Sequence, residues 1–296
     1  MVATIDHAER AKRIGASDVP AILGCSPHRT MHTVWLEKTE RIEPDKGGEA
    51  ARLGNRLEVA ILDEAESDLG DLERDVRVWR EDVDFPLAAT LDGRVVATGD
   101  VVQAKTSGMT GPVYGHWGPA GTDEIPEGYV AQTLVEQFCA QAWVSHVYAL
   151  LGGRGMVPYR VRSESALLKA IVQGLRSFWL DYVEPDVEPP RDAEPSIEVA
   201  KRLKREPKKL ITADEGDDVI RLTRRARRLR NMKSRVEKLS KQADAALLLE
   251  LGDAEAVDLP SGHRVTNYTQ SRTTKPVLEP RTSYFPVLRI PKGVIQ

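Results

Sequence analysis

The hydrophobic period of the first half of the chain changes from helical to extended and back, and this order constrains the fold most. Apolar residues in 52–69 recur at spacings of three and four, which predicts an amphipathic helix ending at Gly70. Segments that alternate, or that are short and apolar, predict strands at 75–82, 87–91 with a continuation at 94–97, 100–106, 145–151 and 157–162. Helices are predicted over 16–24, with Ser17 as the N-cap, and over 129–144 and 163–183. The sequence therefore predicts a domain that mixes helices and strands.

A proline-rich stretch separates two regions of different composition. Residues 185–195 contain four prolines with acidic neighbours, which is typical of a boundary or linker. Beyond it, 213–251 is rich in Arg, Lys, Leu and Ala and predicts a long helix, and 256–266 predicts a hairpin. We expect a core domain over residues 1–190 and a C-terminal appendage of basic helix and β-hairpin over 191–296.

Composition excludes several classes of protein. The chain has 296 residues and a net charge of −3, and it contains no run of roughly 18 apolar residues that would predict a membrane span. Its first residues lack the pattern of a signal peptide. Cys25 and Cys139 lie far apart without metal-ligand spacing. We therefore expect a cytoplasmic protein, in a phage or its bacterial host, without a structural zinc site or a disulfide framework.

The positive charge is concentrated in one segment. Residues 201–241 hold sixteen Lys or Arg against six Asp or Glu, so the rest of the chain is acidic. This segment is either a surface that contacts phosphate or a solvated helix face.

Four residues together predict a metal-dependent hydrolytic site. Glu58 lies on the amphipathic helix, Asp92 at a predicted strand end, and Gln103 and Lys105 in the strand that follows. Alternation places residues 103 and 105 on one face of that strand. Carboxylates bind hard cations such as Mg²⁺, and a lysine can orient or deprotonate a cation-bound water.

The chain resembles the YqaJ-like viral recombinases, relatives of the lambda-type exonucleases within the PD-(D/E)xK nuclease superfamily. The resemblance covers roughly residues 10–185 and depends on the joint order and spacing of its motifs. The matching segments are Ile14–Gly24 (IGASDVPAILG), Val34–Thr39 (VWLEKT), Leu53–Glu58 (LGNRLE), Ala89–Gly93 (ATLDG), Val102–Thr106 (VQAKT) and Tyr129–Gln132 (YVAQ).

The resemblance implies a restriction-endonuclease-like α/β core with a central mixed sheet flanked by helices. It assigns Glu58, Asp92, residue 103 and the Ala104 carbonyl to the metal, and Lys105 to catalysis. It further implies that Gln132 faces the site from a helix. Ser17 would hold the terminal 5′ phosphate with Arg10 or Arg13, whose planar guanidinium suits phosphate.

The chain departs from the family pattern at Gln103, where glutamate is expected. Three interpretations remain open: an introduced inactivating substitution, a naturally weakened or lost site, or replacement by another carboxylate. Glu136 is the first candidate for the third, because it lies four residues after Gln132 on the same helix face; Asp100 points away by alternation. Gln103→Glu is therefore expected to raise Mg²⁺-dependent hydrolysis by at least about tenfold, roughly 1.4 kcal/mol, because it restores a negative charge to the metal site.

The resemblance implies an exonuclease that uses Mg²⁺, for which Mn²⁺ can substitute, to degrade the 5′-ended strand of duplex DNA ends. The partners would be DNA ends, a single-strand annealing protein and further copies of the chain in a ring. Gln103 leaves a second hypothesis, a non-catalytic DNA-end-binding protein on a decayed nuclease fold. A nicking endonuclease is a third, and closed circular DNA as substrate would distinguish it.

Overall fold

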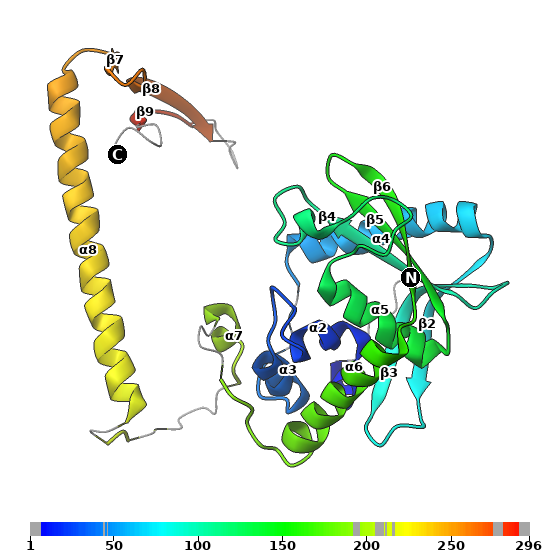
Figure 1. Cartoon of the computed structure of the whole chain (residues 1–296). Helices are drawn as coiled ribbons and strands as arrows, with labels where there is room; N and C mark the ends of the chain where they lie inside the picture. Colours follow the sequence, from blue (N-terminus) through cyan, green and yellow to red (C-terminus); the bar gives the residue numbers. More distant parts are fainter. Residues whose placement is uncertain are drawn as a thin grey trace. The chain divides into compact units, whose positions relative to one another are not determined.

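The computed structural model describes residues 7–43, 45, 47–191, 196–204, 210, 212–214, 217–274 and 281–289. The chain divides into two compact units, Met1–Pro207 and Lys208–Gln296 (Figure 1). The helices of the first unit are α1 His7–Ala11, α2 Val19–Ile22, α3 Met31–Lys38, α4 Glu49–Leu69, α5 Glu127–Ala140, α6 Ser165–Phe178 and α7 Ile197–Lys201. Its strands are β1 Ile14–Gly15, β2 Leu72–Arg80, β3 Leu87–Val95, β4 Val101–Ser107, β5 Val144–Leu151 and β6 Gly155–Arg162.

A six-stranded mixed sheet forms the centre of the first unit. Its order is β1-β3-β4-β5-β6, and β2 also pairs with β3. The β1–β3 and β4–β5 pairs are parallel, whereas β2–β3, β3–β4 and β5–β6 are antiparallel. The mixed sheet predicted from the sequence is confirmed.

Helices cover both faces of this sheet (Figure 1). On one face, α4 buries Ile61, Leu62 and Ala65 against Val102 and Tyr148. On the other, α5 contributes Leu134 and Val135 to a core with α2, α3, α6 and the first half of β3. Leu57, Ile61, Ala65 and Leu69 of the predicted apolar stripe therefore face the sheet, as in an amphipathic helix, whereas Leu53 is exposed.

Strands β3 and β4 separate after a short ladder. They pair only at Gly93–Val102 and Arg94–Val101. The Ala104 N–H, which a longer ladder would direct to the β3 backbone, instead donates to the Asp92 carboxylate at 2.8 Å. Beyond these pairs, this side-chain contact joins the two strands in place of a backbone ladder.

Strand β3 is also irregular at Asp92. Before this residue, Ala89 and Leu91 pack in the α5 core. After it, Val95 belongs to the α4 core, although strict alternation would keep these odd-numbered residues on one face. Across on β2, Asp75 has a φ of 55° and is skipped by the pairing register. Such local breaks reorient side chains next to sites.

Two local predictions differ from the structure. Asp92 lies inside a continuous β3 rather than at a strand end, because Gly93 and Arg94 continue the ladder with β2. The helix predicted over 16–24 is divided into a 3₁₀ turn, Ala16–Asp18, and α2. Ser17 is not its cap; the Asp18 carboxylate accepts the Gly15 N–H at 3.1 Å instead.

The chain returns to the core after the proline-rich stretch. Leu203 forms a β-bridge with Ile42, and the Lys204 N–H donates to the Arg41 carbonyl at 2.9 Å. Arg202 pairs with Glu37 at 2.8 Å and also donates to the Glu43 carbonyl. The segment around α7 is therefore part of the first unit.

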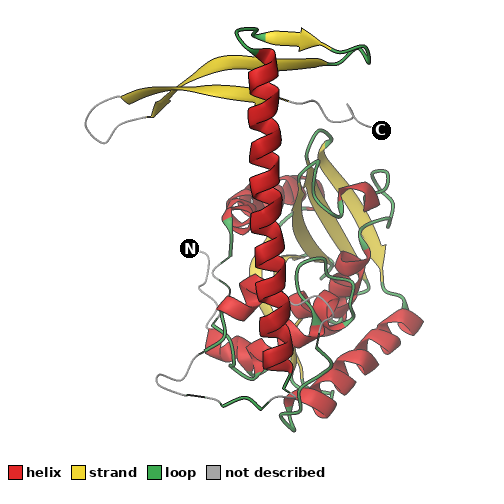
Figure 2. Cartoon of the chain, turned by 90° about the vertical axis from the view of Figure 1, so that its left-hand side faces the viewer, coloured by secondary structure: helices red, strands yellow, loops and turns green. Residues whose placement is uncertain are grey.

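The second unit contains the long helix α8, Asp218–Leu251, and a sheet of β7 Ala256–Asp258, β8 Arg264–Thr274 and β9 Arg281–Arg289 (Figure 2). The long helix and the hairpin β7–β8 predicted from the sequence are confirmed. Helix α8 carries ten Lys or Arg against four acidic residues. Among the described residues, no helix is long and apolar enough to cross a membrane.

Candidate active site

A cavity of about 440 Å³ in the first unit collects carboxylates and arginines on one surface. It is lined by charged and polar residues from α1, the 3₁₀ turn, α3, α4, β2, β3 and α5. Those that carry the argument below are Arg10, Arg13, Ser17, Lys38, Glu58, Asp75, Asp92, Gln132 and Glu136. Most of the residues predicted from the sequence therefore lie together. Gln103, Ala104 and Lys105 are not among the residues that line the cavity.

Asp92 is held by the main chain of the neighbouring strand. Its Oδ2 accepts the Ala104 N–H, and its other oxygen has no hydrogen bond among the described residues. Burial raises the pKa of this carboxyl, and the charge of Asp75 adds to the increase, whereas Lys105 and the Ala104 N–H oppose it. The ionised form of Asp92 is therefore destabilised, and a cation bound beside it would stabilise it.

Glu58 lines the same cavity from helix α4, whereas Asp92 lies on strand β3. Glu58 lies at helical spacing from Leu62, so the helix that packs on the sheet also points this carboxyl into the cavity. Burial raises its pKa, and the charges of Asp92 and Asp75 raise it further, while Lys105 lowers it. The carboxylates thus repel one another across the cavity.

Gln103 is fully buried and has both ends of its carboxamide occupied. Its Nε2 donates to Glu136 Oε2 at 2.8 Å, and its Oε1 accepts from Thr133 Oγ1 at 3.0 Å. Gln132 donates through Nε2 to the other Glu136 oxygen at 2.7 Å. Two amides therefore hold one buried carboxylate on α5.

Glu136 is a third acid of the site with a raised pKa. Burial raises its pKa to about 7, and the charge of Asp92 contributes to the increase, whereas Lys105 and the two amides lower it. Its interactions with Asp92 and Lys105 place Glu136 in the same electrostatic group as the residues that the family pattern predicts.

Lys105 lies beside this group. Its Nζ lies 5.3 Å from the centroid of the Tyr129 ring, a cation–π contact that orients the ammonium. Lys105 lowers the pKa values of Glu58, Asp92 and Glu136 alike. It is the cation common to all three carboxyls.

Two arginines of the N-terminal segment, Arg10 and Arg13, also line the cavity. The Arg10 guanidinium donates to Ser17 Oγ at 3.3 Å, and both side chains line the cavity. Arg13 also lines it but is paired with Glu9 at 3.1 Å and lies over the Trp79 ring. Arg10 therefore has the more direct relation to Ser17.

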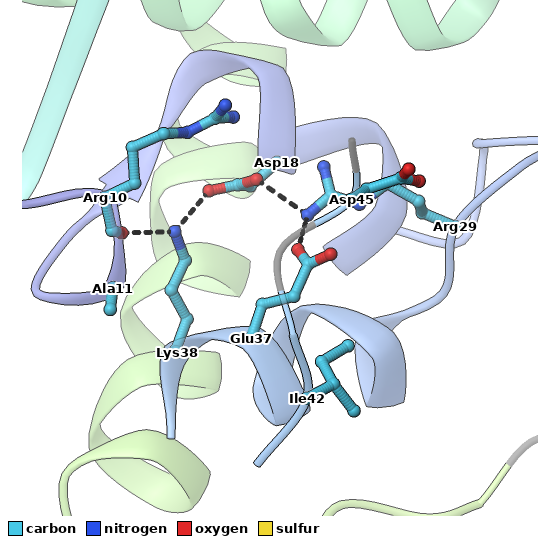
Figure 3. Close-up of a pocket in the computed structure, with 8 residues that line it drawn as sticks. All are labelled: Arg10, Ala11, Asp18, Arg29, Glu37, Lys38, Ile42 and Asp45. Carbon is cyan, nitrogen blue, oxygen red and sulfur yellow. Dashed lines mark hydrogen bonds and ion pairs between the residues drawn. The ribbon is translucent and has the colours of Figure 1, made fainter. Parts of the chain in front are cut away.

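A network of ion pairs contacts the main chain of Arg10 (Figure 3). Lys38 Nζ donates to the Arg10 carbonyl at 2.8 Å and pairs with Asp18 at 2.6 Å. Arg29 bridges Asp18 and Glu37. Burial alone raises the pKa of Asp18, but Lys38 and Arg29 outweigh it and hold that pKa far below its usual range.

Several of these residues were not predicted from the sequence. Asp18 and Lys38 are in quoted motifs but were given no role. Asp75 lies in a strand of alternating charged residues, and only its positive φ across from Asp92 distinguishes it. Asn55 lies in the motif Leu53–Glu58 but has no role assigned there, and nothing in the sequence marks Arg77; both residues also line the cavity.

Comparison with known proteins finds relatives of the part of the chain that contains these residues. Residues 7–145 match the model of the YqaJ-like viral recombinase domain. The uncharacterized protein YqaJ of Bacillus subtilis (strain 168) is 27% identical over 181 residues, which are 59% of this chain and 54% of that protein. The chain thus spans about half the length of this curated relative.

Solved structures of low identity are also similar. An alkaline exonuclease from Laribacter hongkongensis is 15% identical over 59% of this chain and 90% of its own, with a TM-score of 0.46. A putative exonuclease from Eubacterium rectale is 11% identical over 71% of this chain and 94% of its own, with a TM-score of 0.49. At these levels the site assignment depends on the chain's own residues. Residues 7–145, which contain the first part of the sheet and most of the cavity, are thus similar to the YqaJ-like viral recombinase domain.

Proposed function

We propose that the chain is a divalent-cation-dependent exonuclease that degrades the 5′-ended strand of duplex DNA from its ends. The observation that carries this proposal is the composition of one cavity, which combines Glu58 and Asp92 with Arg10 and Ser17. A phosphodiester substrate needs both: donors that hold its charge and carboxylates that hold a cation beside the bond to be cleaved. The alkaline exonuclease and putative exonuclease named above are consistent with it.

The donor set fits a hydrated divalent cation. Among the described residues, no three His, Cys, Asp or Glu side chains form a group that could hold a metal ion by themselves. Mg²⁺, however, commonly keeps several waters and binds through one or two carboxylates plus substrate phosphate. Asp92 and Glu58, with the Ala104 carbonyl, would supply such a set, and Mn²⁺ could replace Mg²⁺. The bound cation would make a water more acidic and offset phosphate charge.

The side chains around this set have distinct tasks in the proposal. Lys105 orients the attacking water and stabilises charge that develops on the phosphate. Gln132 holds Glu136, and Arg10 with Ser17 binds the terminal phosphate. The deciding experiment uses linear duplexes labelled at either the 5′ or the 3′ end and, separately, a closed circular duplex, each with and without Mg²⁺. Release of 5′ label from linear DNA alone supports the proposal; cleavage of the circle indicates an endonuclease.

A 5′-phosphorylated end is expected to be degraded faster than a 5′-hydroxyl end. Arg10→Ala should reduce this preference by roughly tenfold or more, because a charge-assisted hydrogen bond contributes about 1.5–3 kcal/mol. Arg13→Ala is the matched control and should keep most of the preference, since Arg13 is already paired with Glu9. Equal rates on both ends in the parent protein would contradict the phosphate pocket.

The basic face of α8 is expected to strengthen DNA binding without sequence preference. Arg224, Arg227, Arg228 and Arg235 line one groove of this helix with Asn231, and all four are exposed. Replacing the four arginines by glutamine should flatten the plot of log affinity against log salt by up to about 3 to 4, since each phosphate contact contributes about 0.9. Replacement by lysine is the control and should retain the slope. An unchanged slope in the glutamine variant would assign α8 a structural role.

A second candidate, a non-catalytic DNA-end-binding protein, is favoured by the neutral side chain at Gln103. It predicts end binding without hydrolysis at any Mg²⁺ or Mn²⁺ concentration. We further propose a ring of several copies and a single-strand annealing partner. Solution mass tests the first, and co-purification with a candidate annealing protein from the same phage tests the second.

A further inference from the structure

The buried contact between Gln103 and Glu136 gives the unexpected residue at 103 a structural reason. Gln103 is 0% exposed and Glu136 2% exposed, and the amide donates directly to the carboxylate. A carboxylate at residue 103 would have no proton to donate when ionised. A glutamate side chain at this position would therefore place two buried acids at hydrogen-bond distance, where they cannot both be ionised.

Glu136 is placed to act on the same site. It lines the cavity together with Asp92, Glu58 and Gln132. Its other oxygen is fixed by Gln132, so both oxygens are held by amide donors that favour the ionised form. A buried carboxylate that only filled space in a core would not also reach the cavity wall.

We propose that Glu136 on α5 supplies the buried negative charge that the family pattern places at residue 103 on β4, and that Gln103 holds Glu136 in position. This inference rests on the proposed cation-dependent function. It selects the third interpretation of Gln103: the charge of the site is conserved and its carrier differs. It also leads to the opposite expectation for Gln103→Glu, which should impair the protein rather than activate it.

A reciprocal exchange tests the inference. The variants are Glu136→Gln, Gln103→Glu and the double variant that carries both. Each is measured for Mg²⁺ affinity by calorimetry, for melting temperature and for hydrolysis of a 5′-phosphorylated duplex. Glu127→Gln, an exposed position on the same helix, is the control.

Glu136→Gln should weaken Mg²⁺ binding and hydrolysis at least tenfold while the protein stays folded. Gln103→Glu should lower the melting temperature, because two buried acids then meet. The double variant should recover stability and most of the Mg²⁺ affinity, since one acid again faces one amide. Recovery of this kind requires the two positions to exchange roles, which a purely structural contact would not produce for Mg²⁺ affinity.

The outcomes separate this inference from the proposed function. If the parent protein binds Mg²⁺ and hydrolyses DNA, and Glu136→Gln does both equally well, the inference is overturned and the proposed function stands. If Gln103→Glu alone gains affinity and activity, residue 103 is itself the ligand position and the inference is again overturned. A parent protein that neither binds Mg²⁺ nor hydrolyses DNA overturns both.

Discussion

Asp92→Asn is expected to abolish cation-dependent hydrolysis and to raise the melting temperature of the protein. The loss follows from removing one carboxylate from the cation set: a Coulomb contribution of about 4 kcal/mol near a protein surface corresponds to roughly a thousandfold in rate. The gain follows from the raised pKa of Asp92. A carboxyl whose pKa is higher in the folded state makes folding less favourable once pH exceeds its unfolded pKa, and asparagine removes that penalty.

The opposite signs of these two effects make the test specific. Asparagine keeps an oxygen that can accept the Ala104 N–H, so the contact between β3 and β4 can persist. Replacement of the exposed Asp71 by asparagine should change neither hydrolysis nor the melting temperature. Lys105→Met should lose hydrolysis, because it removes the ammonium that interacts with all three carboxyls. If Asp92→Asn melts earlier than the parent, its inactivity would reflect damage to the fold and the assignment would lose its support.

Asp18→Asn is expected to destabilise the first unit by about 3–5 kcal/mol, because it leaves Lys38 buried without its counter-charge. Side chains of both residues are almost completely buried, at 2% and 4% exposure. The depressed pKa of Asp18 adds a pH dependence. The pair contributes its stability above the unfolded pKa of about 3.9 and loses it only as pH falls through the lower folded value. Denaturant unfolding at neutral pH and at acid pH measures both effects.

The chain offers a matched control for this prediction. Arg176 and Asp84 are also 2.6 Å apart, but their side chains are 51% and 57% exposed, so Asp84→Asn should leave stability nearly unchanged. Lys38→Met combined with Asp18→Asn should cost less than the sum of the single changes, since the unpaired ammonium is then absent. Additive costs would show that the pair is not coupled. Loss of the Lys38 contact to the Arg10 carbonyl should also reduce the preference for 5′-phosphorylated ends.

The sequence predicted the order of the elements well, because their hydrophobic periods are unambiguous. The stripe in α4 and the apolar segments of β4 and β5 predict a helix and two strands directly. Errors occurred where a few residues change conformation. The division of 16–24 depends on the hydrogen bond from Gly15 to Asp18. Alternation alone cannot show that the side chains of β3 change face at Asp92, opposite Asp75.

For the candidate site, the motifs identified the residues but not which of them interact. Glu58, Asp92 and Gln132 line one cavity, and Arg10 rather than Arg13 contacts Ser17. The pairing of Gln103 with Glu136 joins residues 33 positions apart in the sequence on different elements, so spacing could suggest it but not establish it. The network of Asp18, Lys38 and Arg29 is long-range in the same way.

The return of α7 to the core decides where the chain can be cut. Because the proline-rich stretch at 185–195 is the predicted domain boundary, an expression fragment would naturally be ended near residue 190. Such a fragment would lack Arg202, leaving Glu37 with Arg29 as its remaining partner, and would expose the edge of Ile42 that Leu203 covers. A fragment meant to isolate the first unit, or to crystallise it without α8, should therefore extend to Pro207. A protease that cuts within the prolines would release a weakened unit rather than a minimal one.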